Sequence, residues 1–231
     1  MKQGEHVTTI GPTGSGKTVL NRELLKLRDF VLVLGVKNRD PELYGGFERE
    51  GYRQVNKFDP TPADDATEER VLYVPKTSKH GAEGRKERAG KLRHALNDVY
   101  DAGAWAVYVD DVQYVSDQLG LSTELEELWM LGRSEGVTVV ASSQEPVNIP
   151  LMAYGQATHL FLFQNPDLRR ADRMAELTGV NREIVRETIL RLPPHEFLYA
   201  NKATQDLVRS KVERTPRLAP SPTPSGAPSA R

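Results

Sequence analysis

A glycine-rich stretch near the amino end, TTIGPTGSGKTVL, places a lysine and a threonine among three glycines between two apolar runs. Its centre fits the pattern G-x-x-x-x-G-K-[ST] of a phosphate-holding loop. The pattern is filled by Gly11, Pro12, Thr13, Gly14, Ser15, Gly16, Lys17 and Thr18. In such a loop the backbone N–H groups point inward, Lys17 reaches the β and γ phosphates, and the Thr18 hydroxyl holds Mg²⁺. The stretch therefore predicts ATP and Mg²⁺ as ligands.

Two adjacent carboxylates, Asp110 and Asp111, end a second apolar stretch, WAVYVDD. Such a pair at the end of a buried strand is costly unless a metal or a water molecule uses it. We expect Asp110 to bind Mg²⁺, directly or through water, and Asp111 to be the general base that polarises the attacking water. The alternative is a capped strand end at Asp110, followed by an ordinary surface carboxylate at Asp111.

Gln144 and Arg133 flank a third apolar stretch, VTVVASSQ. We expect this strand to lie between the strand that precedes the phosphate loop and the strand that precedes Asp110. The Gln144 amide then comes near the γ-phosphate, where it orients water or reports the bound nucleotide. The alternative is a polar residue leaving a strand. We expect Arg133 to face away from its own nucleotide and, in a ring, to reach the neighbour's γ-phosphate, a contact typically worth ~10³–10⁵ in rate. Its alternative role is to stabilise a helix C-terminus.

The surrounding pattern alternates strand-like and helix-like segments. Strands are predicted at 6–11, 29–36, 70–75, 105–111, 137–144 and 158–164. Helices are predicted from Lys17 onward and at 84–101, 122–133, 167–178 and 181–191, the third with a capping box in Thr123 and Glu126. Residues 45–65 are polar and turn-rich, which indicates a surface excursion. The alternation predicts an α/β fold, in which helices sandwich a mostly parallel central sheet.

Size and composition suit one α/β domain, since the chain has 231 residues, 38% of them hydrophobic. The apolar runs have only strand length and no secretory signal opens the chain, so we expect no intrinsic membrane segment. Without cysteines, disulfides and thiolate metal sites are excluded. A net charge of −1 argues against a protein that coats DNA passively.

The carboxyl-terminal part differs in composition from the rest. From Lys202 onward there are six basic and two acidic side chains, and residues 215–231 are rich in proline and serine. We therefore divide the chain into a motor domain at 1–201, a basic extension at 202–214 and a tail at 215–231. The tail is expected to be disordered, because it cannot bury enough apolar surface to offset ordering. The alternative is a basic tether for a partner or DNA.

Together these stretches resemble the FtsK/HerA superfamily of DNA-pumping ATPases over about residues 5 to 200. IGPTGSGKT is common to many families, whereas VYVDDVQ, GRSEGVTVVASSQEP and ATHLFLFQNPDLRRADRMAELTG are similar to further parts of this one. The resemblance implies a RecA/ASCE-type P-loop NTPase fold. It also implies that Asp110 binds Mg²⁺, Asp111 is the base, Gln144 is the sensor and Arg133 is a finger acting in trans. The family usually has Glu where Asp111 stands, which implies slower hydrolysis or a closer water.

A bare motor of this length looks like the small genome-packaging ATPases of double-stranded DNA viruses. The implied partners are double-stranded DNA, further copies in a pentameric or hexameric ring, and a viral capsid vertex or portal. The implied location is the host cytoplasm, at the packaging vertex. Alternatives are an ATPase of DNA transfer or filamentous-phage assembly, a nucleotide-dependent switch that hardly hydrolyses ATP, and a small-molecule kinase.

A motor that grips DNA needs basic side chains along its path. Residues 76–93 carry seven Lys or Arg against two Glu, and the candidate phosphate contacts are Lys76, Lys79, Arg85 and Lys86. Such contacts are independent of base sequence and sensitive to salt. A second candidate is LRRADR at 168–173. The alternative for both is a solvated helix face.

Overall fold

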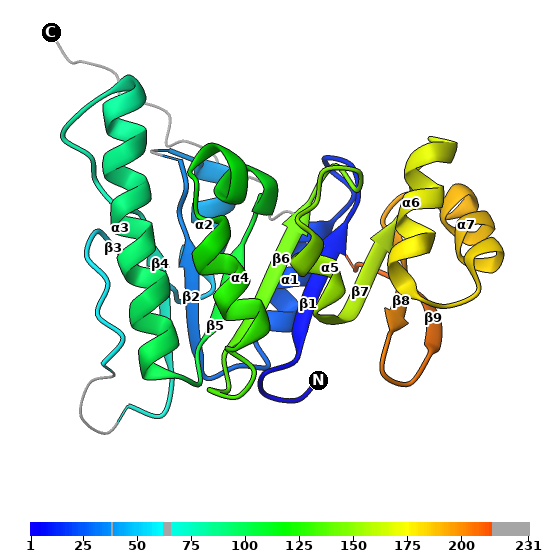
Figure 1. Ribbon diagram of the computed structural model, residues 1–231, viewed down its shortest axis with the longest axis horizontal. Helices are drawn as coiled ribbons and strands as arrows, with labels where there is room; N and C mark the ends of the chain where they lie inside the picture. Colours follow the sequence, from blue (N-terminus) through cyan, green and yellow to red (C-terminus); the bar gives the residue numbers. More distant parts are fainter. Residues whose placement is uncertain (38, 62–65, 214–231) are drawn as a thin grey trace, which may run out of the picture.

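The computed structural model describes residues 1–37, 39–61 and 66–213, so the tail at 215–231 lies outside the described residues. The described part forms three layers, in which helices cover both faces of one sheet (Figure 1). This architecture confirms the predicted α/β class.

The sheet has the strand order β3-β4-β2-β5-β6-β1-β7-β8-β9. Its strands are β1 (His6–Ile10), β2 (Phe30–Leu34), β3 (Arg53–Val55), β4 (Glu69–Tyr73), β5 (Ala106–Val109), β6 (Thr138–Ser143), β7 (Ala157–Phe163), β8 (Glu196–Asn201) and β9 (Asp206–Lys211). The pairs among β1 to β7 are parallel, whereas β7–β8 and β8–β9 are antiparallel. Strand β6 lies between β1 and β5, as the interpretation of Gln144 required.

Helices divide between the two faces of the sheet. One face is covered by α1 (Lys17–Leu25) and α2 (Pro41–Arg49), whose buried residues share a core cluster. The other face carries α3 (Gly81–Ala102), α4 (Ser122–Met130), α5 (Leu151–Gly155), α6 (Leu168–Thr178) and α7 (Arg182–Arg191). A short π-helical turn, η1 (Tyr114–Gln118), follows β5.

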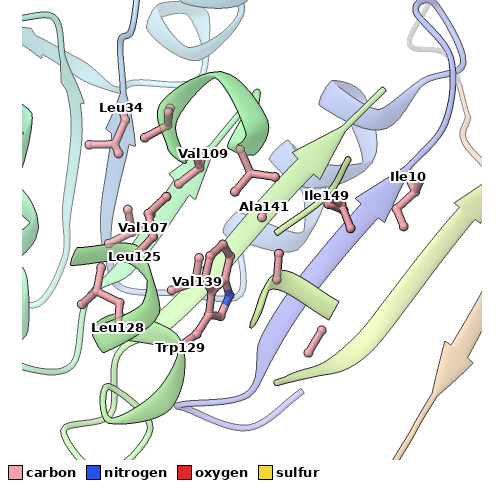
Figure 2. Packing of buried hydrophobic residues seen from close by; sticks show 14 of the residues in the cluster. Ile10, Leu34, Val107, Val109, Leu125, Leu128, Trp129, Val139, Ala141 and Ile149 are labelled. Carbon is pink, nitrogen blue, oxygen red and sulfur yellow. The ribbon is translucent and has the colours of Figure 1, made fainter. Parts of the chain in front are cut away.

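The two central strands are fixed by apolar packing on the α4 face. Every residue of β5 and β6 is buried, as expected for parallel strands covered on both sides. Leu125, Leu128 and Trp129 of α4 point onto the side chains of β5 and β6 (Figure 2). Trp129 is 1% exposed, because its ring packs between α4 and the sheet. This packing fixes the positions of the strands that lead into Asp110 and Gln144.

Two local predictions were wrong. Part of the supposed surface excursion at 45–65 is structured, because α2 extends into it and β3 lies within it. Helix α2 begins at Pro41, and the Asp40 carboxylate accepts a hydrogen bond from the Leu43 backbone N–H at 3.1 Å, a standard N-cap. The capping box on α4 is absent, because the helix begins at Ser122 with Leu121 as N-cap and no side-chain cap bond.

The carboxyl-terminal segment adds to the sheet. Within 202–214, residues Asp206–Lys211 form β9 and pair with β8, while residue 214 lies outside the described residues. Across the ranges that the structure describes, no helix is both long and apolar enough to span a bilayer.

Candidate nucleotide site

The phosphate loop joins β1 to α1, as predicted. The Gly11 backbone N–H donates to the Ser143 carbonyl at 3.2 Å, which ties the start of the loop to β6. A side chain at Gly11 would meet Phe163 at 2.5 Å, and Gly16 has φ 111°, a backbone conformation that favours glycine. Gly11 and Gly16 therefore stand at positions that favour glycine, the first for space and the second for its backbone conformation.

Lys17 is buried at the base of this loop. Its Nζ donates to the carbonyls of Gly11 at 2.6 Å and Pro12 at 2.9 Å. Burial lowers the pKa of Lys17 to about 8, against the opposing effect of the charges on Asp110 and Asp111. The ammonium thus lies inside the loop, beside two carboxylates, where it can meet a phosphate.

Asp110 lies opposite Thr18. The Thr18 hydroxyl is 3.5 Å from Asp110 Oδ1, and the Tyr108 hydroxyl donates to the same oxygen at 2.5 Å. The Ser142 hydroxyl donates to the Asp110 backbone carbonyl and lies 3.4 Å from Oδ1. One carboxylate oxygen is therefore held in place from three elements.

Thr18 and Asp110 fit a magnesium ion that is shared with a nucleotide. Both supply oxygen, the ligand type that Mg²⁺ prefers, and Mg²⁺ beside phosphates needs only one or two protein ligands. Among the described residues, no group of three or more His, Asp or Glu side chains could hold a metal by itself. Thr18 and Asp110 can thus hold Mg²⁺ only when phosphate oxygens supply further ligands.

Asp111 borders an open pocket of about 440 Å³ beside the loop. Its Oδ1 accepts a hydrogen bond from the Tyr114 backbone N–H at 3.3 Å, so the half-buried carboxylate also caps the turn that follows β5. The pocket is lined by Pro12, Thr13, Asp111, Gln113, Gln144, Glu145 and Arg170. The predicted base therefore faces the same space as the phosphate loop.

Gln144 reaches the loop directly. The Thr13 hydroxyl donates to Gln144 Oε1 at 2.8 Å. Next to it, Glu145 forms an ion pair with Arg170 at 2.6 Å, which links the end of β6 to α6. The structure thus brings Gln144 together with the loop, Asp110 and Asp111.

Arg133 lies at the opposite edge of the sheet. It precedes β6, so it sits at the amino ends of the parallel strands, whereas the phosphate loop sits at their carboxyl ends (Figure 1). Its carbonyl accepts from the Gly136 N–H at 3.2 Å, and its side chain is exposed. Arg133 is therefore not part of the cluster within one chain.

The basic run at 76–93 is only partly available to a ligand. Lys76, Lys79, Arg85 and Lys86 are all exposed. Lys79 pairs with Glu83 at 3.1 Å, and the run's Lys91 and Arg93 are also in ion pairs. In the second candidate, 168–173, both Arg170 and Arg173 form ion pairs. Among the described residues, Lys76, Arg85 and Lys86 form no ion pair.

Sequence reasoning missed two side chains that contact the site. Tyr108 lies on β5 two residues before Asp110, which directly follows that strand. In an extended chain this spacing places both side chains on the same face, so a signal was present. His195 reaches the loop from the turn before β8, where its Nδ1 lies 3.2 Å from the Ser15 carbonyl. No local pattern could have indicated a contact across 180 positions.

The fold has known counterparts, although no family model and no curated protein sequence matches the chain. The genome packaging NTPase B204 from Sulfolobus turreted icosahedral virus 2, in complex with ATP-gammaS, superposes with a TM-score of 0.64 at 17% identity, over 93% of this chain and 100% of that one. VirB4 of Thermoanaerobacter pseudethanolicus gives 0.65 at 11%, over 91% and 90%. The pCW3 conjugation coupling protein TcpA gives 0.54 at 16%, over 90% and 60%.

These likenesses extend over nearly the whole chain and not only over the phosphate loop. At the level of the fold, they confirm the resemblance inferred from the sequence. The chain has the fold of a P-loop NTPase of the kind found in viral genome-packaging and conjugation proteins.

Proposed function

We propose that the protein is an ATP hydrolase that moves double-stranded DNA. The observation that carries this proposal is the meeting of four features at the carboxyl edge of the sheet: the phosphate loop, Asp110, Asp111 and Gln144. A loop alone would suit a kinase, a switch or a motor. A sensor amide on a strand between the two phosphate-site strands gives a nucleotide-dependent contact, which a motor requires.

Each side chain has a role that its position supports. Lys17 neutralises the β and γ phosphates, and Thr18 and Asp110 hold Mg²⁺, which supplies further neutralisation of the phosphate charge. Asp111 accepts a proton from the attacking water, because its carboxylate borders the pocket beside the loop. Gln144 orients that water, and its hydrogen bond with Thr13 connects the amide to the phosphate loop.

The proposed cargo is duplex DNA, and the proposed setting is the packaging of a viral genome into a preformed capsid by a pentameric or hexameric ring. Likeness to a genome packaging NTPase over 93% of this chain supports that setting. In this account the ring works in the host cytoplasm at a capsid vertex or portal. Lys76, Arg85 and Lys86 contact the DNA phosphates, because they are exposed and form no ion pair with described residues.

The test is the rate of phosphate release by size-fractionated protein, with and without long duplex DNA. We expect duplex DNA to stimulate turnover, and the double variant Arg85→Ala/Lys86→Ala to need more DNA for half-maximal stimulation, with a weaker salt dependence. The matched control is Arg191→Ala, an exposed arginine on α7 far from the run. Equal phosphate release with and without DNA would contradict the proposal, whereas no phosphate release at all would favour a switch or a kinase.

Arg133 is proposed as a finger that acts on the neighbour's nucleotide. Since Arg133 precedes β6 and so lies at the amino ends of the strands, away from its own phosphate loop, a catalytic role for it would have to be at a site on another copy. Lys17→Ala and Arg133→Ala are each expected to abolish turnover, and mixing the two variants is expected to restore part of it. A mixture as inactive as its components would exclude the trans role.

A second candidate is a DNA-transfer ATPase, favoured by the likeness to VirB4 over 91% of this chain. The two candidates differ in their partner. Fractionation of producing cells separates them, because a packaging motor sediments with empty capsids, whereas a transfer ATPase sediments with membranes.

A further inference from the structure

We infer that Tyr108 is a positioning residue for Asp110. Asn21 assists by a hydrogen bond to the Tyr108 hydroxyl, and Ser142 assists by a hydrogen bond to Asp110 itself. This inference rests on the proposed function, since it assumes that Asp110 holds Mg²⁺ beside a nucleotide. It concerns a buried hydrogen-bond chain that joins four elements of the site.

The first link is the hydrogen bond between Tyr108 and Asp110. Tyr108 is fully buried, and its hydroxyl donates to Asp110 Oδ1 at 2.5 Å. That oxygen is also the one that lies 3.5 Å from the Thr18 hydroxyl. The tyrosine thus holds the carboxylate oxygen that faces the second magnesium ligand.

The chain continues into the helix that follows the phosphate loop. Asn21 on α1 is fully buried, and its Nδ2 donates to the Tyr108 hydroxyl at 3.4 Å and to Thr9 Oγ1 at 2.9 Å. Thr9 in turn donates to the Ala141 carbonyl of β6 at 3.3 Å. One network therefore joins β1, α1, β5 and β6.

Ser142 holds Asp110 from the other side. It stands on β6, two residues before Gln144, and its hydroxyl bonds the Asp110 backbone carbonyl and lies near Oδ1. The strand that ends in the sensor amide therefore also contacts the metal-site carboxylate. A shift of β6 relative to β5 would change both contacts together.

Core packing alone does not account for a tyrosine here. A buried hydroxyl costs free energy unless it is hydrogen-bonded, and a phenylalanine would fill the same apolar space without that cost. The ring packs against Phe47 with centroids 5.6 Å apart, so the hydroxyl is carried on a fixed side chain. The tyrosine thus serves to fix Asp110 in one rotamer before Mg²⁺ arrives.

The test measures the affinity of the full-length protein for a fluorescent ADP at increasing Mg²⁺ concentrations, at equilibrium and without turnover. In Tyr108→Phe we expect the Mg²⁺ concentration for half-maximal effect to rise by about tenfold, the lower end of the usual cost of losing a hydrogen bond behind a metal ligand. Affinity for the nucleotide in EDTA is expected to stay unchanged. Tyr73→Phe on β4 is the matched control, a buried tyrosine outside the nucleotide site whose hydroxyl lies 3.5 Å from the Lys91 carbonyl.

The outcomes separate this inference from the proposed function. If wild-type protein binds the nucleotide with no dependence on Mg²⁺, the assignment of Asp110 as a metal ligand fails, and the inference fails with it. If wild type depends on Mg²⁺ but Tyr108→Phe responds as Tyr73→Phe does, only the positioning role is overturned. Should Tyr108→Phe fail to fold, Ser142→Ala replaces it, with the same shift expected and an unchanged Mg²⁺ response as the contradicting result.

Discussion

The Thr13 hydroxyl donates a hydrogen bond to Gln144 Oε1 over 2.8 Å, which connects the phosphate loop with the end of β6. The two side chains come from positions 131 residues apart, and both line the pocket that Asp111 borders. A change in the loop on nucleotide binding would therefore reach Gln144, the amide that is proposed to orient water. The proposed coupling of nucleotide state to movement begins at this contact.

Replacing Gln144 by alanine should slow catalysis without weakening nucleotide binding. We expect kcat to fall by about 100-fold, because the attacking water loses its orientation, while the nucleotide dissociation constant stays nearly unchanged. Steady-state phosphate release and a fluorescent-nucleotide titration give the two numbers. Gln113→Ala removes another amide from the same pocket and should have little effect. Equal losses in both variants would contradict the sensor role.

Asp111→Asn should remove the base but keep the fold. The asparagine oxygen can still accept from the Tyr114 N–H, so the turn after β5 keeps its cap. Loss of a positioned base is expected to lower kcat by roughly 10²–10⁴-fold, measured as phosphate release at saturating ATP. Asp111→Glu restores a carboxylate and should retain much of the activity. Turnover of Asp111→Asn at the wild-type rate would rule out this base.

His6 should make folding stability depend on pH. Burial, followed by the charge of Arg133, lowers its pKa from 6.5 to about 4, and its Nδ1 accepts from the Val139 N–H at 3.0 Å. Between these values the unfolded chain binds a proton that the folded chain does not. The contribution of His6 to stability is therefore fully present above pH 6.5 and is lost as pH falls from 6.5 to about 4, by roughly 3 kcal/mol in total.

His6→Asn is the matched variant, since its amide oxygen can accept from Val139 but does not titrate. Urea unfolding at pH 7 and pH 4.5 should show a smaller loss for the variant than for wild type. The same loss in both proteins would show that another group causes the acid sensitivity.

His195→Ala should weaken nucleotide binding, because the Ser15 carbonyl loses the imidazole donor that lies 3.2 Å away. One such hydrogen bond is worth about 1 kcal/mol, or roughly fivefold in the dissociation constant. His195 has φ 66°, which asparagine tolerates, so His195→Asn should recover the affinity through its own N–H donor. Binding that is equally weak in both variants would mean that His195 acts only through folding.

The positions of the phosphate loop, the acidic strand end and Gln144 could be predicted because each combines a motif with an element of strong periodicity. The buried run VTVVASSQ indicated a strand, and the pairing of β6 between β1 and β5 then placed Gln144 as expected. Helix α2 was missed because its turn-like composition outweighed an N-cap signal at Asp40 and Pro41. The capping box on α4 was wrong because a four-residue pattern does not fix the register of a helix start.

The part of the site that could not be predicted from the sequence depends on tertiary contacts. The bond from Asn21 to Tyr108 and the contact of His195 with Ser15 join residues 87 and 180 positions apart, and no local pattern encodes such pairs. The β8–β9 hairpin was read as the end of the domain and a basic extension, because an exposed edge strand lacks the alternation that marks a buried one.

The most direct test of the account is movement along DNA itself. A third-strand oligonucleotide bound to a long duplex is displaced by a protein that translocates, and the displaced strand can be counted on a gel. We predict displacement by the wild-type protein that requires hydrolysable ATP and is absent in Lys17→Ala. If the wild type hydrolyses ATP in the presence of the duplex yet leaves the third strand in place, the protein is not a DNA translocase.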